Sequence, residues 1–283
     1  MPASRLAVDL SGTILRVLEG TPGGLMRCGE GAPPPGSMDH GRVVDPTLLG
    51  QALRQLVART EISGNRALIA ASDAIASFRV LDFSTGTADE DIEAELKRQL
   101  PQQSDRMSLR RTDVLPGRGL RTIYAVIWDR GQVQAMAETA RHAGLEPAVV
   151  ELKSLCVARA IAAPSCILLD MTGEPCEAVL IDEHVPRVSH VFTIGSGGDL
   201  PTELAAGLRP VLAFYRQSTG AEFPAESPIL VRADQMLPTL MATRLEGMTG
   251  HPVRPLPQPP RVLPEVRFVP FLTCIGLVMR RRQ

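Results

Sequence analysis

Short apolar runs alternate along the chain with stretches whose apolar residues recur at helical spacing. Four runs have the length and composition of buried strands, at 6–8, 67–71, 122–128 and 166–169. Two of the intervening segments open on a helix-capping aspartate, Asp45 and Asp129, and carry apolar residues three or four positions apart. The Gly/Pro-rich stretch Gly29–Gly36 has no such period and is expected to be a loop. This alternation predicts an α/β chain in which helices cover the strands of a sheet.

Two of the strand runs are followed by the same short pattern. The first ends at Asp9, passes through a turn of small residues and returns as an apolar run at 14–18. The second ends at Asp170, passes through a similar turn and returns at 178–181. Taken singly, each pattern is typical of an ordinary hairpin. Facing each other across a cleft, the two hairpins would hold nucleotide phosphates on backbone amides, with each aspartate near a magnesium ion. The candidate nucleotide-binding residues of the two hairpins are Asp9, Ser11, Gly12, Thr13, Asp170, Thr172 and Gly173.

Composition narrows the classes of function. A chain of 283 residues with 44% hydrophobic residues can bury a large core, and its length favours two lobes or domains. A net charge of −1 and an aromatic content of 4% argue against nucleic-acid binding. The five cysteines lack CxxC spacing and His184 and His190 have no partner at ligand spacing, so neither disulfides nor a metal site is expected. No apolar run approaches the roughly 20 residues that span a bilayer, and no signal peptide opens the chain, which predicts a cytoplasmic protein.

The order of these segments resembles that of the PilM-type proteins of type IV pilus assembly, an actin-like ATPase family related to the cell-division protein FtsA. The matching segments are Leu6–Glu19, Gly41–Leu56, Phe78–Pro101, Ala143–Ile161, Ile167–Ile181, 195–215 and Phe268–Arg280. The resemblance implies an α/β fold of the actin type, with duplicated ribonuclease H-like lobes and a small inserted α/β subdomain. We expect residues 1–77 to begin the first lobe, residues 78–146 to form the subdomain, and residues 147–283 to complete the first lobe and form the second.

The resemblance also implies ATP with magnesium as a ligand, and this chain departs from the family at the expected site. The hairpin turns of the family begin Asp-x-Gly, whereas Ser11 and Thr172 stand at those glycine positions. Two further sets of residues are expected near the nucleotide: Gly195, Gly197 and Gly198 in a glycine turn, and Arg232, Ala233 and Asp234 in place of the family's glycine-rich adenosine turn. Bulky side chains narrow a turn in which only backbone fits. We therefore expect a degenerate nucleotide site, and no catalytic residue for ATP hydrolysis is identifiable.

For function, the resemblance implies a cytoplasmic scaffold at the inner face of the inner membrane, touching the membrane only through its partners. PilM-type proteins bind the N-terminal tail of the membrane protein PilN in a groove between the main body and the small subdomain. Arg79, Leu81 and Phe83 alternate along one predicted strand and are candidates to border that groove, although the same alternation fits an ordinary strand with one face in the core. Contact with other pilus proteins and oligomerisation are compatible with this interpretation.

Two alternatives stay open at the level of the sequence. One is an ATP-binding switch or weak ATPase of the pilus or of a type II secretion system. The other is a sugar-kinase-like or chaperone-like protein of the same fold, because a fold does not by itself determine a function.

Overall fold

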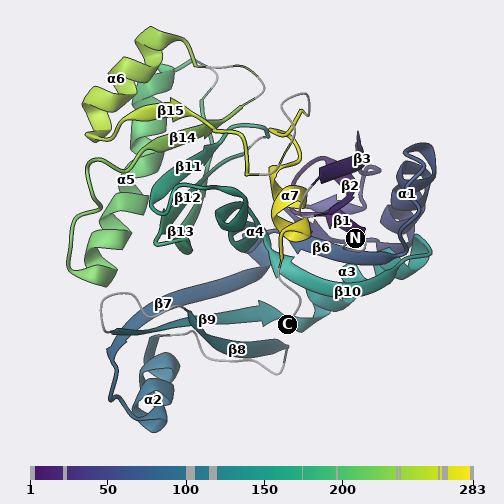
Figure 1. The fold of residues 1–283 in the computed structure, drawn as a ribbon, viewed down its shortest axis with the longest axis horizontal. Helices are drawn as coiled ribbons and strands as arrows, with labels where there is room; N and C mark the ends of the chain where they lie inside the picture. The colour runs from purple at the N-terminus through teal and green to yellow at the C-terminus, as the bar shows by residue number, and fades with distance from the viewer. Residues whose placement is uncertain are drawn as a thin grey trace.

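The computed structural model describes residues 4–21, 24–99, 106–114, 120–173, 175–195, 197–233, 235, 237–260, 262 and 267–280. Two lobes lie side by side, with a small subdomain below them in the view of Figure 1. The sheet of the first lobe consists of β1 (Arg5–Asp9), β2 (Leu15–Thr21), β3 (Gly24–Gly31), β6 (Arg66–Ala71) and β10 (Glu146–Leu152). Its order is β10-β6-β1-β2-β3, in which β1–β2 and β2–β3 are antiparallel and β1–β6 and β6–β10 are parallel.

The sheet of the second lobe repeats this arrangement strand for strand. It consists of β11 (Cys166–Asp170), β12 (Cys176–Asp182), β13 (Val185–Phe192), β14 (Ile229–Arg232) and β15 (Val253–Pro255). Its order is β13-β12-β11-β14-β15, with β12 and β13 antiparallel and β14 and β15 parallel to their inner neighbours. Because both sheets share one order and one set of directions, the predicted duplication of ribonuclease H-like lobes is confirmed.

Two helices cover the outer face of each sheet, and two other helices pack between the sheets. The first sheet is covered by α1 (Pro46–Arg59) and α3 (Arg130–His142), and the second by α5 (Leu200–Thr219) and α6 (Thr239–Thr249). As predicted, α1 and α3 begin after the capping side chains of Asp45 and Asp129, which accept hydrogen bonds from the first backbone amides of each helix. The inner helices are α4 (Lys153–Ala160) and α7 (Leu272–Val278), which pack together between the two sheets (Figure 1).

The crossing of α4 and α7 depends on one glycine. A Cβ atom at Gly276 would lie 1.9 Å from the carbonyl oxygen of Cys156, so only glycine allows the two helices to approach this closely. Residues from both sheets and from both helices form one continuous buried core here, with Ala7 and Leu18 on one side and Leu168 and Val179 on the other. The two lobes are therefore joined by apolar packing around α4 and α7.

The small subdomain is inserted after β6. The 3₁₀ turn η1 (Asp73–Ile75) leads into β7 (Ala76–Ser84), α2 (Asp89–Gln99), β8 (Met107–Val114) and β9 (Leu120–Asp129). The sheet order is β7-β9-β8, and Ile92 and Leu96 of α2 pack on Ile123 and Ile127 of β9 in a separate core. The helix α3 follows within the range 78–146, but Met136 and Ala140 on α3 belong to the core of the first lobe.

One expectation about local structure was wrong. The stretch Gly29–Gly36 was expected to be a loop, yet its first three residues continue β3, which pairs with β2. The glycines have a packing reason, because a Cβ atom at Gly29 would lie 2.2 Å from the methyl carbon of Thr60 at the end of α1. The stretch ends in a turn before a small hairpin of β4 (Met38–Asp39) and β5 (Arg42–Val43).

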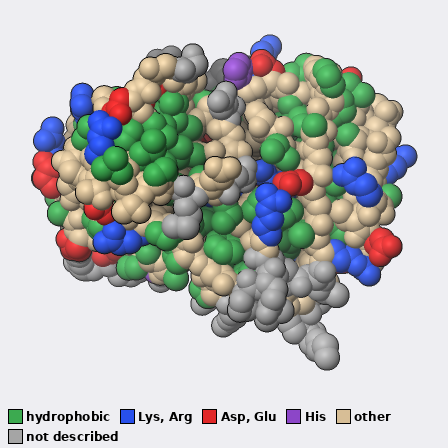
Figure 2. Space-filling view, turned by 90° about the horizontal axis from the view of Figure 1, so that it is seen from above, with side chains coloured by type: hydrophobic (Ala, Val, Ile, Leu, Met, Phe, Trp, Pro, Cys, Tyr) green, Lys and Arg blue, Asp and Glu red, His purple; other side chains and the backbone are tan. Residues whose placement is uncertain are grey.

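The surface seen from above carries mixed charges. In Figure 2, basic and acidic side chains are interspersed around the rim, and hydrophobic side chains gather on the second lobe, at the left. The most exposed large hydrophobic side chain is that of Leu240 on α6, at 74%. Within the described ranges, no helix has both the length and the apolar character needed to cross a membrane.

Candidate functional site

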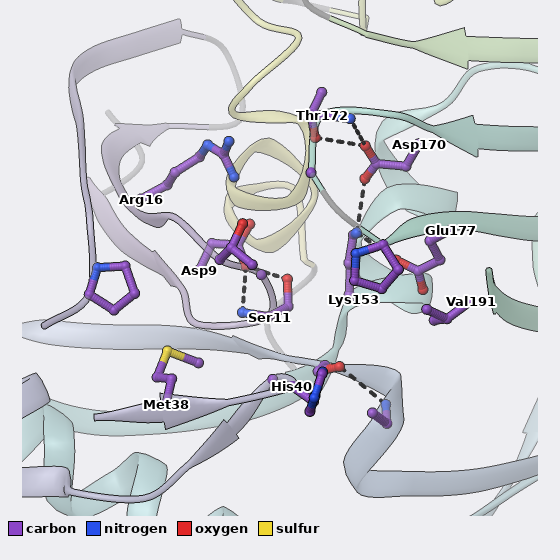
Figure 3. Close-up of a pocket in the computed structure, with 18 of the residues that line it drawn as sticks. Asp9, Ser11, Arg16, Met38, His40, Lys153, Asp170, Thr172, Glu177 and Val191 are labelled. Carbon is purple, nitrogen blue, oxygen red and sulfur yellow. Dashed lines mark hydrogen bonds and ion pairs between the residues drawn. The ribbon is translucent and has the colours of Figure 1, made fainter. Parts of the chain in front are cut away.

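Both predicted hairpins open onto one cleft between the lobes. The cleft has a volume of about 500 Å³ and lies where β1 turns into β2 and β11 turns into β12. All seven candidate residues of the hairpins line it: Asp9, Ser11, Gly12, Thr13, Asp170, Thr172 and Gly173. The duplicated fold therefore brings together two turns that are about half a chain apart in the sequence (Figure 3).

The two residues that replace the family's glycines make the same contacts in both hairpins. The amide and hydroxyl of Ser11 donate to Oδ1 of Asp9, at 2.9 and 2.5 Å. The amide and hydroxyl of Thr172 donate to Oδ1 of Asp170, at 3.0 and 2.7 Å. Each hydroxyl thus adds a second donor to a carboxylate oxygen that already accepts from the backbone amide, which a glycine would also supply. The hydroxyl at the position of the glycine in Asp-x-Gly therefore leaves each aspartate with less capacity to accept further hydrogen bonds.

Asp170 is further neutralised by two cations of the chain itself. Its Oδ2 atom lies 2.8 Å from Nζ of Lys153 and 2.8 Å from Nη1 of Arg232. Lys153 also reaches Oε2 of Glu177 at 2.5 Å, so that its ammonium lies between the two carboxylates (Figure 3). Together with the two donors of Thr172, the carboxylate of Asp170 has four donors for about four lone-pair sites. We call Lys153, Asp170, Glu177 and Arg232 the ion cluster.

The electrostatics of the ion cluster favour the charged forms of Asp170 and Lys153. Burial alone would raise the pKa of Asp170, but Arg232 and Lys153 hold it well below its usual range. Burial alone would lower the pKa of Lys153, but Asp170 and Glu177 raise it above the ordinary value. Because Asp170 pairs with two cations and Lys153 with two carboxylates, the charges of the cluster offset one another within the protein.

Arg232, expected in the adenosine turn, lines the same cleft as the two hairpins. Arg232 is the last residue of β14, lies beside Asp170 in the parallel pair β11–β14, and is 1% exposed. Its side chain turns inward, where Nε donates to the carbonyl of Val269 and Nη2 to that of Pro270, each at 2.8 Å. Ala233 packs at the edge of the second-lobe core, and Asp234 lies outside the described residues. Arg232 thus ties the second sheet to the segment that enters α7.

The predicted glycine turn is not brought to the cleft. Gly195, Gly197 and Gly198 precede α5 and do not line the cleft between the lobes. The carboxylate of Glu203, in the first turn of α5, accepts a hydrogen bond from the amide of Gly195. A Cβ atom at Gly198 would lie 1.5 Å from Oε1 of Glu203. The glycines therefore make room for a carboxylate of the chain itself.

Several residues of the cleft were missed by the sequence analysis. Lys153 and Glu177 belong to the ion cluster, and Arg16 and His40 also line the cleft. Arg16 is 7% exposed, and within the described structure its Nε atom has no hydrogen-bond partner. One signal in the sequence was available, because Lys153 is one of only two lysines among 30 basic residues.

A second cavity lies between the small subdomain and the second lobe. This groove, of about 380 Å³, is lined by 76–79 of β7, 187–191 of β13, and Pro210, Val211 and Phe214 of α5, with Asp73 and Ala74 at one end. Arg79 lies in it, with its guanidinium carbon 5.6 Å from the ring centre of Phe214. Leu81 and Phe83 instead pack against the core of the subdomain. In the described structure, β7 pairs only with β9 and β13 only with β12, so both walls of the groove are edge strands.

Comparisons with known proteins identify the class of fold to which this architecture belongs. No protein-family pattern matches the sequence, and no curated protein matches it either. Solved structures do match along nearly the whole chain, and they define the class as two-lobed proteins of the actin-like ATPase fold, as predicted.

The particular likeness is to a chain of the PilM–PilN type IV pilus biogenesis complex, at 20% identity and a TM-score of 0.74, with 98% of each chain covered. The cytoplasmic domain of EpsL, an inner-membrane component of the type II secretion system of Vibrio cholerae, matches at 13% identity and a TM-score of 0.56 over 99% of this chain and 97% of that one. The ethanolamine utilization protein EutJ from Carboxydothermus hydrogenoformans matches at 16% identity and a TM-score of 0.53, over 99% of this chain and 90% of that one. At these identities the likeness establishes the fold, and the predicted resemblance to PilM-type proteins is confirmed at that level.

Proposed function

We infer that the protein is a cytoplasmic scaffold of a type IV pilus assembly machine, which binds the N-terminal tail of a PilN-like inner-membrane protein and has a degenerate nucleotide site. The observation that carries this proposal is the groove between two edge strands beside the small subdomain. The likeness to a chain solved in a PilM–PilN complex supports the choice of partner.

The chemistry of the groove suits an extended peptide. An edge strand presents unpaired amide and carbonyl groups, to which a peptide adds as a further strand. The five residues 187–191 of β13 that line the groove would pair with a peptide of similar length, roughly 17 Å when extended. Phe214 offers an apolar contact for its side chains, and Arg79 offers a positive charge at the same place.

The cleft, by contrast, does not fit a magnesium nucleotide at Asp170. The four donors on this carboxylate leave no lone pair for a metal ion or its water. A metal ion there would also stand beside two fixed positive charges. We therefore derive no hydrolytic step and propose a scaffold that works without nucleotide turnover.

One observation favours the alternative of an ATP-binding switch. The buried Nε atom of Arg16 has no hydrogen-bond partner in the described structure, although it lies 3.6 Å from the carboxylate of Glu30, and the turn Gly12–Thr13 lines the same open cleft. An arginine and backbone amides form an anion site without a metal. Calorimetry with ATP, with and without magnesium, separates the two functions, because a scaffold with a degenerate site releases no heat of binding at millimolar nucleotide.

The scaffold is tested by peptide binding. A labelled peptide of the tail of a PilN-like protein should bind the protein without ATP, measured by fluorescence anisotropy. Phe214→Glu places a charge in the groove on a side chain that is 36% exposed and should abolish binding. Leu240→Glu, on an exposed side chain of α6 that does not line the groove, is the matched control. Equal binding by both variants, or no binding by the wild-type protein under any nucleotide condition, would sink the proposal.

A further inference from the structure

Two adjacent residues at the start of α4 connect the cleft to the groove. Lys153 holds Asp170 and Glu177 in the cleft, at 2.8 and 2.5 Å. Its neighbour Ser154, fully buried, donates from its hydroxyl to Oδ1 of Asp73 at 3.1 Å. Asp73 lies in η1, lines the groove and leads directly into β7. The turn that begins α4 therefore touches the β7 wall of the groove from behind.

The ion cluster also holds the opposite wall. Glu177 binds Lys153 with one oxygen and with the other accepts a hydrogen bond from the Ser189 hydroxyl at 2.8 Å. Ser189 lies on β13 and lines the groove. The path from the cleft to the β13 wall thus runs through one ion pair and one hydrogen bond. The side chains of Lys153, Asp170 and Glu177 are 13%, 4% and 10% exposed, so water screens these contacts little.

Asp73 on the β7 side also interacts electrostatically with Glu177, the carboxylate that holds the β13 wall. Burial raises the pKa of Asp73, and the nearby carboxylate of Glu177 raises it further, to about 7. The second oxygen of Asp73 is buried and has no hydrogen-bond partner in the described structure. The ammonium of Lys153 lies next to two of these acidic groups, 2.5 Å from Glu177 and 2.8 Å from Asp170.

We propose that Lys153 is a positioning residue for the groove: its ammonium takes the place of a ligand in the cleft, holds β13 through Glu177, and keeps the groove formed without nucleotide. The inference rests on the proposed function, in which the groove binds a peptide. Without the ammonium, Asp170 still pairs with Arg232, whereas Glu177 has no other ion-pair partner in the described structure, and the repulsion between the two carboxylates pulls Glu177 away from Ser189. The β13 wall then loses one of its links to α4, while the β7 wall keeps its contact with Ser154 and the two walls stay joined by the ion pair of Arg187 on β13 with Asp82 on β7, at 3.1 Å.

The test compares the two lysines of the chain. Lys153→Met removes the ammonium and keeps most of the side-chain volume, while Lys97→Met removes the same charge from an exposed position on α2. Hydrogen–deuterium exchange is measured for residues 76–79 and 187–191, with the strands β1 and β6 as an internal reference. We expect faster exchange in the groove walls of Lys153→Met, no change in Lys97→Met, and substantial recovery in Lys153→Arg, which keeps a cation.

Affinity for the labelled tail peptide provides the second readout. Lys153→Met should weaken binding by roughly tenfold or more, the size of a typical coupling between sites. Unchanged exchange in both walls, or an equal increase in the walls and in β1 and β6, overturns the inference. If Lys153→Met does not fold, Ser189→Ala carries the same test, because it keeps every ion pair and removes the hydrogen bond that joins the β13 wall to Glu177. Failure of the wild-type protein to bind the peptide refutes the proposed function, while the exchange data still decide the role of Lys153.

Discussion

Arg232 offers the sharpest test of the ion cluster, because a single side chain joins Asp170 to the segment before α7. In Arg232→Met, three hydrogen bonds of 2.8 Å are lost, one to the carboxylate of Asp170 and two to the carbonyls of Val269 and Pro270. Arg232 is 1% exposed, so water does not replace them. A buried acceptor left without a donor costs about 1–3 kcal/mol, and breaking a buried ion pair costs about 3–5 kcal/mol.

The expected loss of stability is smaller than the sum of these terms. Lys153 still neutralises Asp170, and the methionine side chain fills part of the space with apolar contacts. We expect Arg232→Met to lower the free energy of unfolding by about 3–5 kcal/mol, measured by urea denaturation followed by circular dichroism. The double variant with Asp170→Asn should be less destabilised than the two single variants predict together, by about 1–3 kcal/mol, because it leaves no unmatched charge of this pair.

A matched control shows whether the loss of stability depends on the burial of the ion pair or on its short distances. Arg244 contacts Asp199 at 2.7 and 2.8 Å, as close as Arg232 contacts Asp170, but its side chain is 45% exposed. Arg244→Met should leave the urea midpoint nearly unchanged, since water and salt screen an exposed pair. A loss below about 1 kcal/mol for Arg232→Met, or equal losses for the two variants, would refute the reasoning about the ion cluster.

Three further predictions concern single positions. Burial and Glu177 raise the pKa of Asp73 from 3.8 to about 7. The folded protein therefore keeps a proton that the unfolded chain releases above about pH 4. As a result, the stability of the fold falls as the pH rises from about 4 to 7. Asp73→Asn should match the wild-type stability near pH 4 and exceed it by up to about 4 kcal/mol near pH 8 in urea titrations. Gly276→Ala should lower the thermal midpoint by several degrees, and an unchanged midpoint would contradict the close approach of α4 and α7. Asp45→Ala removes an acceptor from two amides at 2.9 Å and should cost about 1 kcal/mol in urea, whereas no loss would mean that the cap is dispensable.

The hairpins and the duplicated fold could be predicted because their signals are local. Apolar runs that end at Asp9 and Asp170 and return after small residues describe a strand, a turn and a second strand within about fifteen positions each. The capping aspartates that open α1 and α3 are local signals of the same kind. The end of β3 was missed, because Gly29 is explained by the distant Thr60 at the end of α1 and not by any neighbour in the sequence.

The ion cluster could not be predicted, because it is a property of the assembled fold. Its members come from α4, β11, β12 and β14, and no spacing in the sequence brings these four elements together. The sequence placed Arg232 beside a nucleotide turn, but not the direction of its side chain, which depends on the open acceptors Asp170, Val269 and Pro270. The strand β7 also shows that pattern alone does not determine surroundings. Alternation assigns Arg79, Leu81 and Phe83 to one face of β7, but Arg79 lines the groove while Leu81 and Phe83 pack against the subdomain core.

The central claim is that the groove binds a partner tail without help from a nucleotide. The most direct measurement is calorimetric titration of the wild-type protein with the tail peptide of a PilN-like protein, once with a chelator and no nucleotide and once with ATP and magnesium. We expect saturable binding with the same dissociation constant in both conditions, because Lys153 and Arg232 already neutralise Asp170. Binding that appears only with ATP and magnesium would contradict it.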